Sequence, residues 1–193
     1  MPLSFRDPDE VSEYTPYISW KPTDGEWKDR DGVATIASPI VFDFPKLQTG
    51  WKTFDGGRPE WRPDPSTTAP STKPDDGKEW ERGFLVNMFS KKAFGDANPL
   101  REWCDTSRTA QKAIETVYNQ WEQMGDTSKA AVVKFDGAVP VSMGMKTFKM
   151  PGFTIEKLID RPAELDKNEV SGDNANPSLD ATPDTTEDDD EFI

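Results

Sequence analysis

The last thirty residues of the chain cannot build a hydrophobic core, and this limits which part of it can fold. Residues 164–193 carry eleven acids against a single base, Lys167. A segment with such a high net charge and few large apolar residues stays solvated. The 193-residue chain has 36 acids and 23 bases in all, so residues 1–163 are nearly balanced, with 25 acids and 22 bases. We therefore expect one folded domain followed by a disordered acidic tail over residues 163–193.

The residue types that are missing argue against several chemistries. The sequence has no histidine and one cysteine, Cys104, which excludes intramolecular disulfides and multi-thiolate metal sites and removes the commonest general base. It contains no Gly-rich phosphate loop and no zinc-ligand spacing. The terminal acids are a flexible run that would not preorganise six to eight oxygens around a metal. We expect no enzymatic activity, no cofactor and no metal.

The pattern of apolar residues predicts a mainly β domain over residues 32–162. Residues 1–31 show no period and are expected to form an irregular arm. Residues 63–78 are rich in Pro, Ser and Thr and are expected to be a mobile loop. Neither a signal peptide nor a run long enough to span a membrane is visible. We therefore expect a cytoplasmic protein without membrane contact.

Within the domain, one helix is expected among several strands. Apolar residues recur at three- and four-residue steps over 108–124, with Ser107 or Thr106 available as a cap. Residues 98–103 are expected to form a short helical turn. Asp136-Gly137 predicts the tight turn of a hairpin, because Asp-Gly tolerates the positive φ angles that such a turn requires. Strands are predicted over residues 33–42, 50–54, 80–89, 129–135, 138–143, 146–150 and 153–159.

The chain ends in five consecutive acids followed by two apolar residues. The apolar pair and the terminal carboxylate suit an apolar pocket rimmed by Lys or Arg on another protein; the alternative is a tail that only confers solubility. This ending resembles that of the single-stranded-DNA-binding proteins of bacteria and their phages, although the bacterial form ends in Pro-Phe. The acids begin at Glu187, and the residues that the resemblance assigns to partner binding are Asp188, Asp189, Asp190, Glu191, Phe192 and Ile193.

The resemblance implies a small antiparallel barrel of the oligonucleotide/oligosaccharide-binding (OB) type. The expected order of elements, which is strands, then a helix, then a hairpin, is compatible with this fold and also with other small barrels that contain one helix. The resemblance implies coating of single-stranded DNA in phage replication, recombination and repair. It also implies recruitment of a polymerase, primase-helicase or nuclease through the tail, and it is compatible with a homo-oligomer. Two rival functions are an acidic interaction protein that mimics DNA and a virion assembly factor.

The chain has seven Trp, eleven Phe and three Tyr, many of them close to basic residues. Unpaired nucleotides are held by aromatic stacking, worth about 1–3 kcal/mol per base, and by Lys or Arg contacts to phosphates, largely without regard to sequence. The residues predicted to bind DNA are Lys46, Trp51, Lys52, Phe54, Arg58, Trp61, Arg62, Trp80, Arg82, Lys91 and Lys92.

For any single aromatic residue, burial in the core is the main alternative to stacking on bases. Trp61 is the best stacking candidate, because it is expected to lie in a Pro-rich loop between two arginines. Three lysines of the C-terminal hairpin either extend the basic surface or keep an edge strand soluble; these are Lys134, Lys146 and Lys149. The aromatic residues assigned first to the core are Phe84, Trp103, Tyr118 and Trp121.

Overall fold

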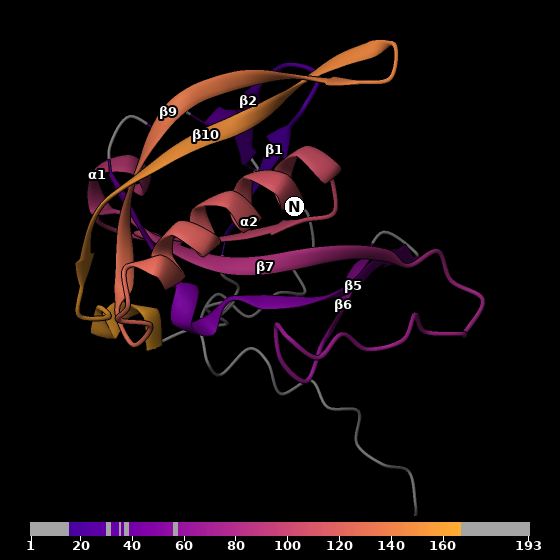
Figure 1. The fold of residues 1–193 in the computed structure, drawn as a ribbon, viewed down its shortest axis with the longest axis horizontal. Helices are drawn as coiled ribbons and strands as arrows, with labels where there is room; N and C mark the ends of the chain where they lie inside the picture. Colours follow the sequence, from indigo (N-terminus) through magenta and orange to yellow (C-terminus); the bar gives the residue numbers. More distant parts are fainter. Residues whose placement is uncertain (1–15, 30–31, 35, 37–38, 56–57, 167–193) are drawn as a thin grey trace, which may run out of the picture.

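The computed structural model describes residues 16–29, 32–34, 36, 39–55 and 58–166. These residues form a strongly curled, open half-barrel sheet of ten strands with one main helix, α2 (Figure 1). The expected mainly β fold with one main helix is confirmed. The elements are β1 (Tyr17–Lys21), β2 (Glu26–Asp29), β3 (Gly32–Ala34), β4 (Ile40–Phe42), η1 (Phe44–Lys46), β5 (Gln48–Asp55), β6 (Arg58–Pro63), β7 (Glu81–Phe89), α1 (Lys91–Phe94), β8 (Leu100–Asp105), α2 (Arg108–Gln123), β9 (Ala130–Met143) and β10 (Lys146–Ile159).

The sheet runs in the order β10-β9-β4-β7-β8-β1-β2-β3, and β5 branches from β7 and carries β6. Neighbouring strands are antiparallel except for β1 and β8, which are parallel. The β1–β2 turn meets β10 and partly closes the curl. There, Trp20 Nε1 donates to the Lys149 carbonyl oxygen at 2.8 Å, and the Lys149 amide donates to the Pro22 carbonyl oxygen at 2.7 Å.

Trp103 lies at the centre of an aromatic core. It is fully buried, and its ring centroid lies 4.8 Å from those of both Trp27 and Phe84 in edge-to-face contacts, a favourable geometry for aromatic pairs. Phe84 and Trp121 are buried too, and Tyr118 packs partly buried against the same cluster. The core assignments made for these four aromatic residues are confirmed.

Helix α2 forms as expected, because its apolar stripe meets the core. Ala110, Val117 and Trp121 are among its buried residues. The Ser107 hydroxyl caps the first turn by accepting from the Ala110 amide. Gly125, with φ +86°, follows the C-terminal end.

Two elements differ from the sequence prediction because long-range pairing overrides local preference. Residues 100–105 form β8 rather than a helical turn, since pairing with β7 buries Leu100 and Trp103. The Asp136-Gly137 pair forms a bulge inside β9 rather than a turn, since β9 pairs with β10 on both sides of it. The turn between β9 and β10 instead lies at Gly144, with φ +62°.

The two boundaries of the domain also differ from those expected. Residues 17–29 form β1 and β2 rather than an irregular arm, because Ile18, Trp20 and Trp27 alternate with polar residues and enter the core. At the other end, Leu165 is fully buried, so residues 163–166 belong to the folded body rather than to the tail. Residues 167–193, where the acidic tail is predicted, lie outside the described residues.

Candidate functional site

The residues predicted to bind DNA are divided between the two faces of the β5–β6 hairpin. Strand β5 pairs with β6 on one side and with β7 on the other. Side chains alternate between faces along a strand, and directly paired residues share a face. The pairing gives an arginine row of Trp51, Arg62 and Arg82, and a lysine row of Lys52, Phe54 and Trp61.

In the arginine row, Arg82 is held by a buried carboxylate. Its guanidinium binds both carboxylate oxygens of Asp64, with 2.7 Å between Nη1 and Oδ1, and lies 5.4 Å from the Trp51 ring centroid. The Asp64 side chain is fully buried and also accepts from the Ser71 amide at 2.8 Å and from the Thr49 hydroxyl. The Arg82 hydrogen bonds hold the Asp64 pKa well below its usual range. Arg82 is therefore paired with Asp64 while 32% of its side chain remains exposed, and its role as a phosphate contact stays a prediction.

At the other end of the arginine row, Arg62 is paired with a second acid, Asp76, which lies with Asp64 in the loop between β6 and β7. Arg62 Nη2 lies 2.8 Å from Asp76 Oδ2, and its guanidinium carbon lies 4.5 Å from the Trp80 ring centroid. Trp80 Nε1 donates to Asp76 Oδ1 at 2.7 Å, and Trp80 is only 3% exposed. Trp80 therefore cannot stack on a base, and its predicted role was wrong. The loop over residues 64–80 folds back over this row through Asp64 and Asp76.

Replacing Asp64 with asparagine should destabilise the protein at neutral pH and have less effect in acid. The folded-state pKa of Asp64 is lowered, so its contribution to stability is present above the usual Asp pKa of about 3.9 and is lost as the pH falls toward the folded-state value. We expect the free energy of unfolding to fall by about 1.5–3 kcal/mol at pH 7. Urea unfolding from pH 7 to pH 3 measures this, with Asp75→Asn as an exposed control from the same loop. A loss that does not change with pH would contradict the assignment.

The lysine row presents a cation and two rings to its face of the hairpin. Phe54 is 67% exposed, and Lys52 Nζ lies 6.0 Å from its ring centroid. Lys52 Nζ also donates to the Cys104 carbonyl oxygen at 3.1 Å. Trp61 is half-buried on β6, so it lies on a strand and not in the expected loop. Its ring covers Gly50, where an added Cβ would come within 2.9 Å of it.

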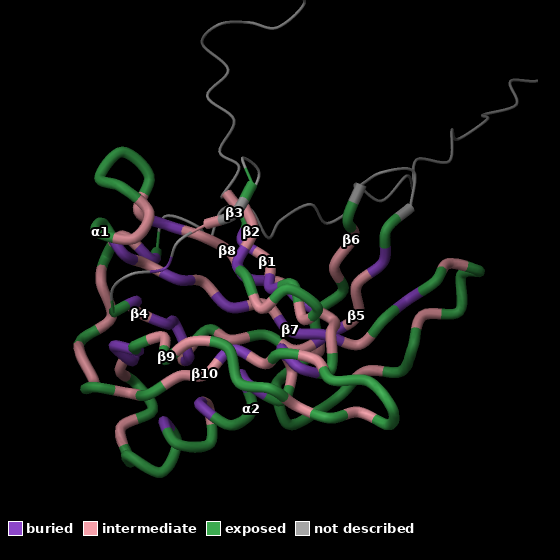
Figure 2. The backbone as a smooth tube through the Cα atoms, turned by 90° about the horizontal axis from the view of Figure 1, so that it is seen from above, coloured by how far each residue is buried: buried purple, intermediate pink, exposed green. Residues whose placement is uncertain are grey.

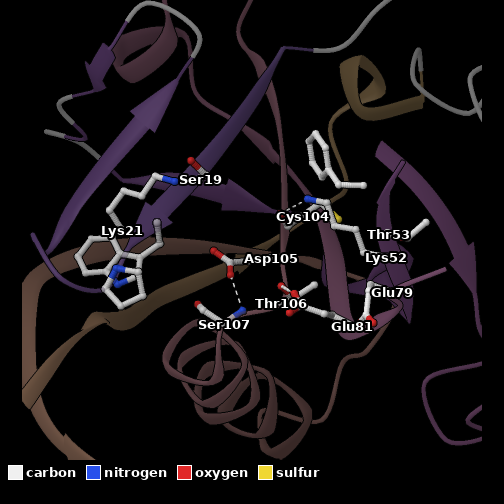
Figure 3. A pocket seen from close by; sticks show the side chains of 13 residues that line it. Ser19, Lys21, Lys52, Thr53, Glu79, Glu81, Cys104, Asp105, Thr106 and Ser107 are labelled. Atoms are coloured by element: carbon white, nitrogen blue, oxygen red, sulfur yellow. Dashed lines mark hydrogen bonds between the residues drawn. The ribbon is translucent and has the colours of Figure 1, made fainter. Parts of the chain in front are cut away.

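A pocket of about 690 Å³ adjoins the lysine row, between β1 and β5 (Figure 3). Lys52 and Phe54 line one side, and Lys21 of β1 lines the other. Sequence reasoning missed Lys21, although the alternation of Ile18 and Trp20 with polar residues could have identified β1. The pocket also holds three acids: Glu79, Glu81 and Asp105.

Hydrogen bonds fix two of these acids in place. Glu81 Oε2 accepts from the Thr106 hydroxyl at 2.6 Å, and Asp105 Oδ1 accepts from the Ser107 amide at 2.7 Å. Burial raises the pKa of the Cys104 thiol to about 11, so the thiol stays protonated at neutral pH and is a poor nucleophile. Burial also raises the pKa of Glu102, against the opposing effect of Lys52. The pocket therefore offers a ligand charged side chains and the exposed ring of Phe54, and no reactive thiol.

The remaining predicted cations do not join the lysine row. Lys91 and Lys92 are exposed on α1, at the opposite end of the molecule from β5 and β6 (Figures 1 and 2). Lys91 Nζ lies 3.8 Å from a carboxylate oxygen of Glu164. Lys46 is exposed on η1. Arg58 lies on β6, but its side chain is outside the described part, as are the tail residues Asp188 to Ile193.

The described residues include no helix long and apolar enough to cross a lipid bilayer, and among them no cluster of three or more His, Cys, Asp or Glu could hold a metal ion. No protein-family model, curated protein or solved structure matches the chain. The resemblance to single-stranded-DNA-binding proteins therefore stays a prediction from the sequence.

Proposed function

We propose that the protein binds and protects single-stranded DNA during replication and recombination. The observation that supports this most is the lysine row, where exposed Phe54 lies beside Lys52 on the same face as Trp61. Unpaired nucleotides offer flat base faces to aromatic rings and phosphates to cations. Duplex DNA keeps its base faces stacked inside the helix, so it cannot use a side chain such as Phe54 in this way.

Single-stranded DNA bound at the lysine row could continue along the neighbouring pocket. The pocket extends from Phe54 and Lys52 on β5 to Lys21 on β1. A strand laid along it would stack a base on Phe54 and bring its phosphates near the two lysines. Only a few phosphates would be neutralised, so we expect moderate affinity. The logarithm of the association constant should fall with the logarithm of the salt concentration, with a slope of about −0.7 for each phosphate contact.

An electrophoretic shift assay tests this proposal. A labelled mixed-sequence single strand should shift at lower protein concentration than the duplex of the same length, and the shift should weaken with added salt. Equal or tighter binding of the duplex would overturn the proposal. Failure to bind either form would favour the rival functions, a DNA-mimicking interaction protein or a virion assembly factor.

The acidic end supports a second part of the proposal, in which the tail recruits replication or recombination enzymes. Residues 167–193 hold nine acids and one base, and end in Phe192 and Ile193. Such a segment would compete with DNA for the lysines of the body until DNA displaces it, which would free the apolar end for a partner protein. A partner with an apolar pocket rimmed by Lys or Arg would complement it.

Removing residues 167–193 should tighten single-stranded-DNA binding about tenfold at low salt, because the competing anion is lost. The truncation retains Leu165, which is buried, and Asp166, which binds Arg161. The double substitution Phe192→Ala with Ile193→Ala is the matched control. It keeps the charge of the tail, so DNA affinity should not change. Capture of a polymerase, primase-helicase or nuclease in a pull-down should be lost. Unchanged DNA affinity after truncation would count against the competition.

A further inference from the structure

The pocket between β1 and β5 has an acidic wall, which a surface that only holds phosphates would not need. Its charged lining consists of two bases, Lys21 and Lys52, and three acids, Glu79, Glu81 and Asp105 (Figure 3). Carboxylates repel phosphate groups and accept hydrogen bonds but cannot donate them. The inside of the pocket therefore suits a neutral group that donates hydrogen bonds, while the lysines suit the phosphates on either side.

Hydrogen bonds within the protein hold two of these acids, Glu81 and Asp105, in fixed positions. Thr106 holds one oxygen of Glu81, which leaves the other oxygen for a ligand. Asp105 is only 8% exposed and is fixed by the Ser107 amide and by Trp103 Nε1 at 3.3 Å. Both oxygens of Asp105 already accept hydrogen bonds within the protein, so Glu81 supplies the acceptor for a ligand. Because Thr106 positions Glu81 before any ligand arrives, a donor that fits it loses little entropy on binding.

The nucleobases differ in the donors that they can offer to such a wall. Cytosine, adenine and guanine carry an exocyclic amino group, whereas thymine has none and presents a carbonyl oxygen where cytosine has its amino group. A carboxylate accepts from the cytosine amino group and repels the thymine carbonyl. Pairing of Glu or Asp with cytosine is a recognised form of base readout.

We propose that this pocket takes one nucleobase that carries an exocyclic amino group, with Phe54 stacking on it and Glu81 accepting from the amino group. The proposal rests on the proposed function and refines it. Contacts to the DNA backbone remain indifferent to sequence, while this one position favours cytosine, adenine or guanine over thymine. A hydrogen bond to a charged acceptor corresponds to roughly tenfold in affinity or more.

The test compares the affinities of oligo-dC and oligo-dT of equal length by fluorescence anisotropy at neutral pH. The full chain should bind oligo-dC about tenfold more tightly. Glu81→Gln should bring the ratio of the two affinities close to one, since an amide can both accept and donate. Glu156→Gln removes the same charge from an exposed position on β10 and should leave the ratio unchanged.

The possible results separate the two proposals. If neither oligonucleotide binds, the proposed function fails. If both bind equally, or if Glu81→Gln and Glu156→Gln have the same effect, the base pocket fails while the proposed function stands. A thermal melt of each variant shows whether it is folded, and Glu81→Asp, which keeps the charge, should retain part of the preference.

Discussion

Replacing Arg161 with alanine should lower the free energy of unfolding by about 3–5 kcal/mol, because it leaves a buried carboxylate without its counter-charge. The Asp43 side chain is fully buried, and Arg161 donates to both of its oxygens, at 2.8 Å from Nε to Oδ1 and 2.8 Å from Nη2 to Oδ2. Arg161 Nη2 also donates to the Leu165 carbonyl oxygen at 3.3 Å. The side chain thus joins the end of the folded body to the residues that precede η1.

Differential scanning calorimetry measures this effect as a fall in Tm of about 6–20 °C for a chain of this size. Lys157→Ala, at an exposed position on β10, is the control and should change Tm little. The double variant Asp43→Asn with Arg161→Met should be less destabilised than Arg161→Ala alone, because no buried charge is left unpaired. A loss below about 1 kcal/mol for Arg161→Ala would show that the pair behaves like an exposed one.

Replacing Phe54 with alanine should weaken single-stranded-DNA binding by about 1–3 kcal/mol, the usual contribution of one stacked base. That corresponds to roughly a fivefold to 150-fold rise in Kd. Phe54 is 67% exposed, so its loss should hardly affect stability. Among the described aromatic residues predicted to bind DNA, Trp51 and Trp61 are half-buried and Trp80 is buried, which makes Phe54 the cleanest site to test.

Met124→Ala provides the matched control for this measurement. Met124 is an exposed large apolar residue, 48% accessible, at the C-terminal end of α2. Its replacement should leave Kd unchanged. The proposal would be contradicted if Phe54→Ala bound DNA as tightly as the unaltered protein while its melting temperature also stayed the same.

The elements that could be predicted from the sequence are those whose signal is local. Helix α2 and strand β7 have a clear period within their own residues, and both form close to the expected positions. Strand β8 has no such period: the burial of Trp103 was expected, but the extended conformation of its segment comes from pairing with β7. The Asp136-Gly137 bulge shows the same effect, since a pair of residues that favours a turn lies inside two long paired strands.

The sequence allowed us to predict which kinds of residue form the candidate site, but not which of them lie together on one face. The predicted strand over residues 50–54 already places Trp51 and Lys52 on opposite faces, but only the register with β6 and β7 shows that Arg62 and Arg82 lie on the face of Trp51 and that Trp61 lies on the face of Lys52. Asp64 lies 18 residues from Arg82, so nothing local predicts that the acid engages this arginine. Lys21 reaches the pocket from β1, which is far from β5 in the sequence.

Ultraviolet crosslinking of bound single-stranded DNA, followed by mass spectrometry of the crosslinked peptides, tests most directly where the unpaired nucleotides lie. We predict crosslinks on β5 and β6, at or beside Lys52, Phe54 and Trp61, which disappear when unlabelled single strands compete. Crosslinks confined to α1 around Lys91 and Lys92, with β5 and β6 unmodified, would contradict the account.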